Sequence, residues 1–565
     1  MAKIWVADME PNARFTLYSR GNVGEVFPHV MSALTATLIG DAVAEGQAGF
    51  LRTMGVLRPH ELVGPSIATG VFGGYLYMNG SAMRLFGVRM PGMSAADADQ
   101  QVMGEVPDLP TYRPARGDRN VAASFALARY SLALLRRPDL APLDRARADA
   151  ERWLGTMPDL GTASDAELLA WTRTYPRRLG ASMRRLLEFS ALAGAPRSLL
   201  DRALAGPAVP PGLANRIVAG TGDVDSARLA QRLWTLGRMV AAEPAVSAAF
   251  DAGLDGVAAR TAGSAFAVAL DGFLADHGHR GNDEYELATP SWAMDPAPVY
   301  AAIDRLRHAP ATRDPAVAGR DLAADADAAL VEASALVRRP LRSFVRRAAM
   351  VCRLGAVGRE RAKDILVLEN LGARRVLHEL VRRAATRGGP ADVRRAFCIT
   401  ADELADYVAA PGPFLDVIEE RFARQSYLDE RQPPAWFEGR IPDPATWRLR
   451  TDARPAPPGA GSTVSGIAVS GGVASGRARV ITDPADPRGL EPGEVLVCAI
   501  TDPSWTPLFL GAVAVVCDTG AVQSHAAIVA RELGIPAVLS VPGITGVADG
   551  TLLHVDGTNG TVRIG

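Results

Sequence analysis

The run Thr519-Gly-Ala-Val-Gln-Ser-His-Ala-Ala-Ile-Val-Ala-Arg-Glu-Leu-Gly-Ile-Pro-Ala-Val538 decides the fold of the C-terminal part of the chain. The apolar segment before it, Gly511 to Cys517, predicts a buried strand. A short helix is then expected to begin near Ser524 and to end at Gly534, because glycine favours helix ends. A second apolar strand is expected from Ala537 to Val541. The predicted unit is therefore strand, turn, helix and strand.

This pattern places His525 in the first turn of the helix. The first N–H groups of a helix have no partner within the helix, and the helix dipole is positive there, so a phosphoryl group is stabilised at that end. A neutral imidazole at the same place is a nucleophile, because the positive end opposes its protonation. His525 is therefore a candidate to accept a phosphoryl group. The alternative is a histidine that only caps or packs against the helix start.

Three parts of this run resemble the phosphohistidine domain, a swivelling domain, of phosphoenolpyruvate-utilising enzymes: Thr519-Gly520, Ser524 to Glu532, and Gly534 to Val538. Many members of that family have glycine where this chain has Ala521, and alanine tolerates left-handed backbone less well. The resemblance implies that His525 forms a phosphohistidine intermediate. It also implies that Thr519, Gly520 and Ser524 bind the phosphoryl group.

Composition limits the class of protein. The chain has 565 residues with 48% hydrophobic residues, enough for several domains, and a net charge of −1 gives no electrostatic reason to expect nucleic acid or a membrane as partner. No stretch approaches the roughly 20 apolar residues of a membrane span, and the N-terminus is not typical of a signal peptide. The four cysteines lie in apolar segments, as buried thiols in a reducing compartment do. We therefore expect a cytoplasmic protein.

Near the N-terminus, Arg20, Asn22 and Glu25 surround two glycines before Pro28. Taken alone, this is a polar loop in which an Arg–Glu pair is usually structural. The spacing resembles a segment in the acceptor domain of rifampicin-phosphotransferase-like proteins. That resemblance implies that Arg20, Asn22 and Glu25 bind the substrate or its phosphate.

Residues from about 120 to 435 are expected to be mostly helical, because apolar residues recur at spacings of three and four. Two of the expected helices are Ala324 to Cys352 and Arg359 to Arg383. The segment Gly358 to Lys363 is expected to open the second of them, with Arg359 and Lys363 on one face. These two cations either bind a phosphate or form a solvated helix face.

The polar loop Asp276 to Trp292 interrupts the helical pattern. Loops on a helical scaffold often carry functional sites. Two interpretations from the residues stay open: a metal site built from His277, His279 and carboxylates, or a hydrogen-bonded structural loop. The loop again resembles the rifampicin-phosphotransferase acceptor domain. That resemblance implies that His279, Arg280 and Glu284, the candidate catalytic residues of the loop, face the place where acceptor and phosphohistidine meet. No metal is expected, because two histidines two positions apart in a loop match neither helical nor zinc-finger spacing.

Residues 450–463 contain several prolines and glycines and are expected to form a linker, which would reach about 40 Å at roughly 3 Å per residue. The predicted fold is multidomain: a mainly α-helical acceptor-binding body at 1–449, the linker, and a small α/β swivelling phosphohistidine domain at 464–565. No part of the sequence resembles an ATP-grasp domain, and the body lacks the strand–helix series of a TIM barrel. ATP and Mg²⁺ are therefore expected on a separate ATP-grasp subunit.

The predicted function is a phosphotransferase component of a two-component, dikinase-type system. An ATP-derived phosphoryl group would be carried on His525 and passed to a hydroxyl of a small organic acceptor. Arg20 and Arg280 would stabilise the transferring charge, and Glu284 or His279 would accept the hydroxyl proton. The alternative is a non-catalytic protein, regulatory or binding, that carries phosphohistidine.

Overall fold

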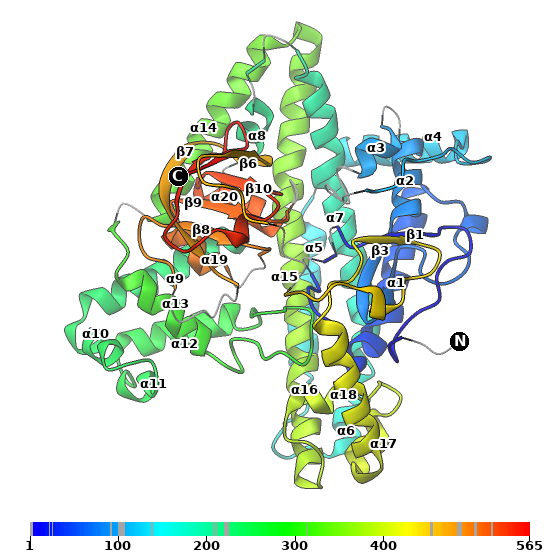
Figure 1. Cartoon of the computed structure of the whole chain (residues 1–565), viewed down its shortest axis with the longest axis vertical. Helices are drawn as coiled ribbons and strands as arrows, with labels where there is room; N and C mark the ends of the chain where they lie inside the picture. Colours follow the sequence, from blue (N-terminus) through cyan, green and yellow to red (C-terminus); the bar gives the residue numbers. More distant parts are fainter. Residues whose placement is uncertain are drawn as a thin grey trace. The chain divides into compact units, whose positions relative to one another are not determined.

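The computed structural model describes residues 4–21, 23–24, 26–90, 93–99, 108–136, 139–206, 209–210, 212–219, 225–311, 314–451, 456–482, 489–501, 505–520 and 524–565. Most of the described body is helical, and the C-terminal part is an α/β sheet region (Figure 1). The chain forms two compact units. The first contains Met1–Phe189, Asp283–Thr289 and Ala362–Arg454, and the second contains Ser190–Asn282, Pro290–Arg361 and Pro455–Gly565. Helices α7 (Tyr175–Ala203) and α15 (Arg342–Thr386) contribute residues to both units.

The first unit combines helices with a four-stranded sheet of order β2-β3-β1-β4. Aromatic side chains fill the core of this sheet; Tyr18, for example, stacks on Phe437 with ring centroids 5.2 Å apart. Helices α1, α5, α6, α17 and α18 share a second apolar core with the C-terminal half of α15. The elements of this unit are β1 (Leu17–Ser19), α1 (Ala33–Met54), β2 (Thr69–Phe72), β3 (Tyr75–Asn79), α2 (Gly80–Arg89), α3 (Ala95–Ala98), α4 (Val121–Arg136), α5 (Ala141–Leu154), α6 (Asp165–Thr172), α16 (Val393–Ala396), α17 (Leu404–Ala409), α18 (Leu415–Asp429) and β4 (Trp436–Glu438).

The second unit is built on an eight-stranded sheet of order β5-β12-β11-β7-β8-β9-β10-β6. Strands β7, β8, β9 and β10 run parallel, and the outer strands pair antiparallel. Its elements are α8 (Leu213–Val218), α9 (Asp225–Ala242), α10 (Pro244–Asp251), α11 (Val257–Arg260), α12 (Ala265–His277), α13 (Ala297–Arg307), α14 (Pro315–Leu336), β5 (Thr463–Ser465), β6 (Ile467–Ser470), β7 (Val473–Val480), β8 (Val495–Cys498), α19 (Thr506–Gly511), β9 (Ala514–Cys517), α20 (His525–Leu533), β10 (Ala537–Leu539), β11 (Leu552–Asp556) and β12 (Thr561–Ile564).

The central strands of this sheet are apolar throughout because both of their faces are buried. In β9, Val515 and Cys517 point to the face that α19 and α20 cover, whereas Ala514 and Val516 join the core on the opposite face. Successive side chains of a strand point to opposite sides, so a strand buried on both faces has no polar alternation. This explains why the sequence predicted a continuous apolar strand here.

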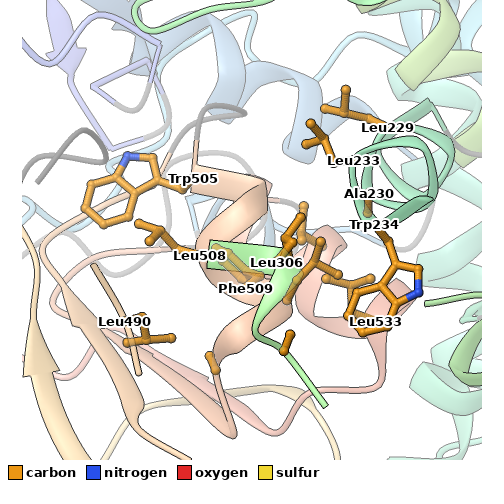
Figure 2. Packing of buried hydrophobic residues seen from close by; sticks show 14 of the residues in the cluster. Leu229, Ala230, Leu233, Trp234, Leu306, Leu490, Trp505, Leu508, Phe509 and Leu533 are labelled. Carbon is orange, nitrogen blue, oxygen red and sulfur yellow. The ribbon is translucent and has the colours of Figure 1, made fainter. Parts of the chain in front are cut away.

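Helices α19 and α20 lie between the sheet and a second helical layer. Helix α19 contacts α9 and α13, and α20 contacts α9 and α14. One apolar cluster includes Leu233 and Trp234 of α9, Leu306 of α13, Phe509 of α19 and Leu533 of α20 (Figure 2). The sheet region and helices α9 and α13 therefore share a single core within the second unit. The proposed division at 450–463 and 464–565 stays a prediction.

Several predicted boundaries need correction. The expected helix Ala324 to Cys352 is broken: α14 ends at Leu336 and α15 begins at Arg342. Pro340 lies in the break, and proline lacks an N–H donor and disfavours helical backbone in the residue before it. Gly511 ends α19 rather than opening β9.

Candidate functional site

Helix α20 has the ends that its sequence predicted. Ser524 is the N-cap, and its side chain accepts a hydrogen bond from the Ala527 N–H at 3.3 Å. Gly534 ends the helix with φ 65°, in the left-handed region that glycine adopts at low cost. His525 is the first helical residue and is partly exposed. The local sequence therefore places the imidazole in the first turn, where the helix dipole is positive.

Helix α20 begins at the carboxyl ends of the parallel strands of the sheet. Strands β8, β9 and β10 are parallel neighbours, and β9 leads through the loop after Cys517 into α20. The carboxyl ends of these strands therefore lie at one edge, and His525 follows one of them. Open α/β sheets bind ligands at that edge.

Two buried hydroxyl groups lie next to the imidazole. The Oγ1 atom of Thr501 is 3.1 Å from Nδ1 of His525, and the Oγ1 atom of Thr506 is 3.5 Å from Nε2. The ring of Phe509 meets the imidazole edge-on, with centroids 6.0 Å apart. The hydrogen bond to Nδ1 is well within range, and the one to Nε2 is at the outer limit. The ring is therefore held more firmly through Nδ1.

Sequence reasoning did not identify Thr501 and Thr506 as site residues. They flank a short segment that comes just before α19, and nothing in their spacing to His525 indicates proximity. Pairing of β8 with β9 brings the two segments together. A parallel βαβ arrangement, in which the loops after neighbouring strands meet, was the available signal.

The turn after β9 is fixed by backbone contacts. The Thr519 N–H donates to the Ala499 carbonyl at 3.0 Å, and the Ser540 hydroxyl donates to the Gly520 carbonyl at 2.7 Å. A Cβ atom at position 520 would lie 2.8 Å from Cδ1 of Leu539, so this position requires glycine for close packing. Residues 521–523 lie outside the described residues. Phosphoryl binding by Thr519, Gly520 and Ser524 stays a prediction.

A second polar group lies in the first unit. The Lys363 ammonium is 3.2 Å from a carboxylate oxygen of Glu284, and both side chains are largely buried. The Asn370 side chain donates to the backbone carbonyl of Glu284 at 2.9 Å. Arg374, which is fully buried, donates to the carbonyls of Asp283 and Glu286, each at 2.9 Å. Burial lowers the pKa of Arg374, and the nearby Glu284 charge opposes this shift. The loop at 283–289 is thus fastened to α15.

Arg20 also belongs to this unit. Its guanidinium lies 4.5 Å from the ring centre of Tyr75, and it donates to the Phe27 carbonyl at 2.9 Å. Burial lowers the pKa of Arg20. The Phe27 ring lies 6.0 Å from the ring of Tyr285, the neighbour of Glu284. Residues Asn22 and Glu25 lie outside the described residues.

His279 and Arg280 belong to the second unit and are buried, with 1% and 3% of their surface exposed. The backbone of their loop is closed on itself: the Arg280 N–H donates to the His277 carbonyl at 3.0 Å, and the Trp292 N–H donates to the Arg280 carbonyl at 2.8 Å. Trp292 is part of the apolar cluster that includes Phe509. This loop is therefore rigid in its backbone.

The prediction that Arg359 lies at the start of a helix is wrong, because α15 begins at Arg342 and Arg359 lies in its interior. Arg359 belongs to the second unit, whereas Lys363 belongs to the first. Burial lowers the pKa of Arg531 on α20 to about 10, and the positive charges of Arg197 and Arg359 add to this effect.

Among the described residues, no three His, Cys, Asp or Glu side chains are close enough together to hold a metal ion. None of the described helices is both long and apolar enough to cross a membrane.

Two segments of the chain match known protein families. Residues 183–360 match the rifampicin phosphotransferase fourth domain, and residues 490–560 match the mobile domain of PEP-utilising enzymes. The second segment contains His525, Thr501 and Thr506.

Among curated proteins, the prodigiosin synthesizing transferase PigC of Serratia marcescens is 33% identical over 305 residues, which cover 52% of this chain and 33% of that protein. The rifampicin phosphotransferase of Bacillus cereus is 27% identical over 306 residues, 52% of this chain and 34% of that protein. The uncharacterized phosphotransferase YvkC of Bacillus subtilis is 46% identical over 102 residues, 18% of this chain and 12% of that protein. The chain thus spans about a third or less of the length of these relatives.

Proposed function

We propose that this relative of the phosphoenolpyruvate-utilising phosphotransferases carries an ATP-derived phosphoryl group on His525 and passes it to a hydroxyl of a small organic acceptor. The observation that carries the proposal is the position of His525. Its imidazole lies in the first turn of α20, at the carboxyl edge of a parallel sheet, with a hydroxyl near each ring nitrogen. The likeness of residues 490–560 to the mobile domain supports the same conclusion.

In the proposed first step, Nε2 of His525 attacks phosphorus, and the bond from phosphorus to its leaving group breaks. Nδ1–H donates to Oγ1 of Thr501, which leaves the lone pair on Nε2. The weaker contact of Thr506 with Nε2 gives way to the incoming phosphorus. The positive end of the α20 dipole then stabilises the negative charge of the phosphoryl group. Phosphohistidine formation splits one transfer into two.

In the proposed second step, the acceptor oxygen attacks phosphorus, the bond to Nε2 breaks, and the acceptor proton goes to a base. Glu284 is the candidate base, with His279 as the other; the Lys363 ammonium lies 3.2 Å from a carboxylate oxygen of Glu284. Arg20 and Arg280 are proposed to stabilise the charge on the transferring group. Arg359 and Lys363, with Asn22 and Glu25, complete the proposed phosphate- and substrate-binding set.

The nucleotide is proposed to bind elsewhere. Neither matched segment is described as a nucleotide-binding domain. We propose that ATP and Mg²⁺ bind a separate ATP-grasp subunit, which would make the whole a two-component phosphotransferase of dikinase type. The ATP supplies the phosphoryl group.

The test is the intact mass of the full chain after incubation with ATP and Mg²⁺, alone and with a candidate ATP-grasp protein, handled at alkaline pH because phosphohistidine is acid-labile. A gain of one phosphoryl group only with the partner, lost in His525→Ala, is expected. His554→Ala is the matched control, since this histidine also has a hydroxyl partner, Ser475, 2.6 Å from its Nδ1. Labelling that persists in His525→Ala would refute the assignment.

The acceptor role needs a second experiment. Phosphorylated protein is mixed with small alcohols and phenols, and loss of the phosphoryl group is followed. Arg280→Ala is expected to slow this loss while leaving formation of phospho-His525 unchanged, and Arg280→Lys is expected to keep part of the rate. An equal loss in both half-reactions would contradict the role of Arg280. If no acceptor accelerates the loss, the protein is a phosphohistidine carrier or regulator without turnover.

A further inference from the structure

Two of the four cysteines, Cys498 and Cys517, face each other at the carboxyl ends of two central strands, on the side of the sheet where α20 begins with His525. Cys498 is the last residue of β8, Cys517 is the last residue of β9, and the two are direct partners in the parallel pairing. Their Sγ atoms are 3.4 Å apart, and both side chains are fully buried. The other two cysteines, Cys352 and Cys398, lie in helical regions outside this sheet.

Neighbouring strands lie about 4.8 Å apart, which is within the range of Cα separations of about 4.4–6.8 Å that disulfides span. A disulfide would bring the two sulfur atoms to about 2.05 Å, more than 1 Å closer than in the reduced pair. Before the two cysteines in the sequence, β8 and β9 are held together by the hydrogen bonds of their parallel pairing. The movement of the two sulfur atoms must therefore be accommodated by the residues that follow the cysteines, where both strands end.

The residues after these strand ends form the site. The Cys498 carbonyl accepts from the Asp518 N–H at 3.0 Å, so the two strand exits are joined directly. Three residues beyond Cys498, Thr501 contacts Nδ1 of His525. Two residues beyond Cys517, Thr519 begins the turn that leads to α20. Closing the sulfur pair would therefore move the two segments that hold the imidazole.

We propose that Cys498 and Cys517 form a thiol–disulfide switch that turns off phosphoryl transfer through His525. A hydroperoxide is the oxidant: the two thiols lose two electrons and two protons, the S–S bond forms, and the O–O bond breaks to give water and an alcohol, or two waters from hydrogen peroxide. A disulfide formed against the strand ladder is strained, so dithiols reduce it readily. Oxidation is slow relative to that of an exposed thiol, because both sulfur atoms are buried. The effect on transfer rests on the proposed function; formation of the bond does not.

The experiment treats the full chain with hydrogen peroxide and alkylates the remaining thiols after denaturation. A cross-linked peptide pair containing Cys498 and Cys517 is expected by mass spectrometry. The folded protein is then labelled with phosphoramidate, a small donor that phosphorylates histidine without a partner protein. Labelling of His525 is expected to fall several-fold after oxidation and to return after dithiothreitol.

The chain offers its own controls. The Cys352→Ala/Cys398→Ala variant should remain sensitive to peroxide, because neither residue belongs to the pair at the ends of β8 and β9. Cys498→Ala and Cys517→Ala should each label normally and be insensitive to peroxide. No cross-link in the folded protein, or a cross-link with unchanged labelling, would overturn the proposal.

A nitrogen NMR measurement of the His525 ring separates the two proposals. If His525 never labels, the proposed function fails. A shift of the Nδ1 signal on oxidation, absent in Cys517→Ala, would still support the coupling, and no shift in the cross-linked protein would refute it.

Discussion

The surroundings of His525 and those of Glu284 use different chemistry. Around His525, the described contacts include the neutral hydroxyls of Thr501 and Thr506 and the edge of the Phe509 ring. Around Glu284, the described contacts include two cations: the Lys363 ammonium pairs with its carboxylate, and the Arg374 guanidinium donates to the Asp283 carbonyl in the same loop. The helices that carry the first group pack in an apolar core, whereas the second group contains a buried ion pair.

This difference matches what the two regions are proposed to do. A nucleophilic imidazole must stay neutral, and hydroxyl partners orient the ring without adding charge. A buried carboxylate is costly without a partner, and the Lys363 ammonium is that partner for Glu284. Nucleophile and base are thus supported by opposite strategies.

The largest expected effect is the loss of the buried ion pair. Lys363→Met leaves the Glu284 carboxylate buried without its ammonium partner, and breaking such a pair costs about 3–5 kcal/mol of stability. Urea unfolding, with hydrogen exchange in α15 as the local probe, measures this cost. The double variant Glu284→Gln/Lys363→Met should recover most of it.

The matched control for this prediction is Arg382→Ala on the same helix. The Arg382 side chain is 66% exposed and pairs with Glu379 at the surface, so its loss should leave stability almost unchanged. If Lys363→Met and Arg382→Ala behaved alike, the contrast between the two regions would be wrong.

On the His525 side, Thr501→Val removes the hydroxyl but keeps the branched shape. A hydrogen bond of this kind contributes about 1 kcal/mol, so phosphoramidate labelling of His525 should slow by roughly five- to tenfold. The pH profile of labelling should change as well, because the ring loses the partner that fixes its tautomer. Thr551→Val, at an exposed hydroxyl that donates to the Ala548 carbonyl, should leave rate and profile unchanged.

A smaller effect is expected from Ser524→Ala, which removes the N-cap side chain of α20. Loss of the N-cap should reduce the stability of α20 by about 1 kcal/mol, seen as faster amide exchange in its first turn. Ser524→Asp keeps the cap and should restore protection, while its negative charge should slow phosphorylation of His525. Slow exchange in Ser524→Ala would show that the apolar packing of α20, not its cap, fixes the histidine.

The smallest expected effect concerns Glu369, a buried acid on α15. Burial raises the pKa of Glu369 above its usual 4.5, and the Ser182 hydroxyl and Arg178 only partly oppose this. The folded state therefore keeps its proton more firmly than the unfolded state. Stability should fall as pH rises from about 4.5 through the folded pKa. Glu369→Gln should remove this slope and stabilise slightly at neutral pH, as followed by thermal unfolding across pH. A steeper slope in the variant would contradict the sign.

Local sequence determined the elements of the His525 unit. The helix start at Ser524 and the helix end at Gly534 follow from short-range rules, and the structure confirms both. The same rules misplaced the break between α14 and α15, because a propensity pattern treats the alanine- and arginine-rich flanks of Pro340 as one helix.

Only the tertiary structure decided which side chains meet. Thr501 reaches His525 because β8 and β9 pair in parallel, and Cys498 meets Cys517 for the same reason. Lys363 reaches Glu284, 79 positions earlier in the chain, because the loop at 283–289 is fastened to α15. The chain by itself determines where a helix starts and which face is apolar, since those depend on neighbours a few residues away. Contacts between distant segments depend on how whole elements pack, and no short stretch of sequence encodes that.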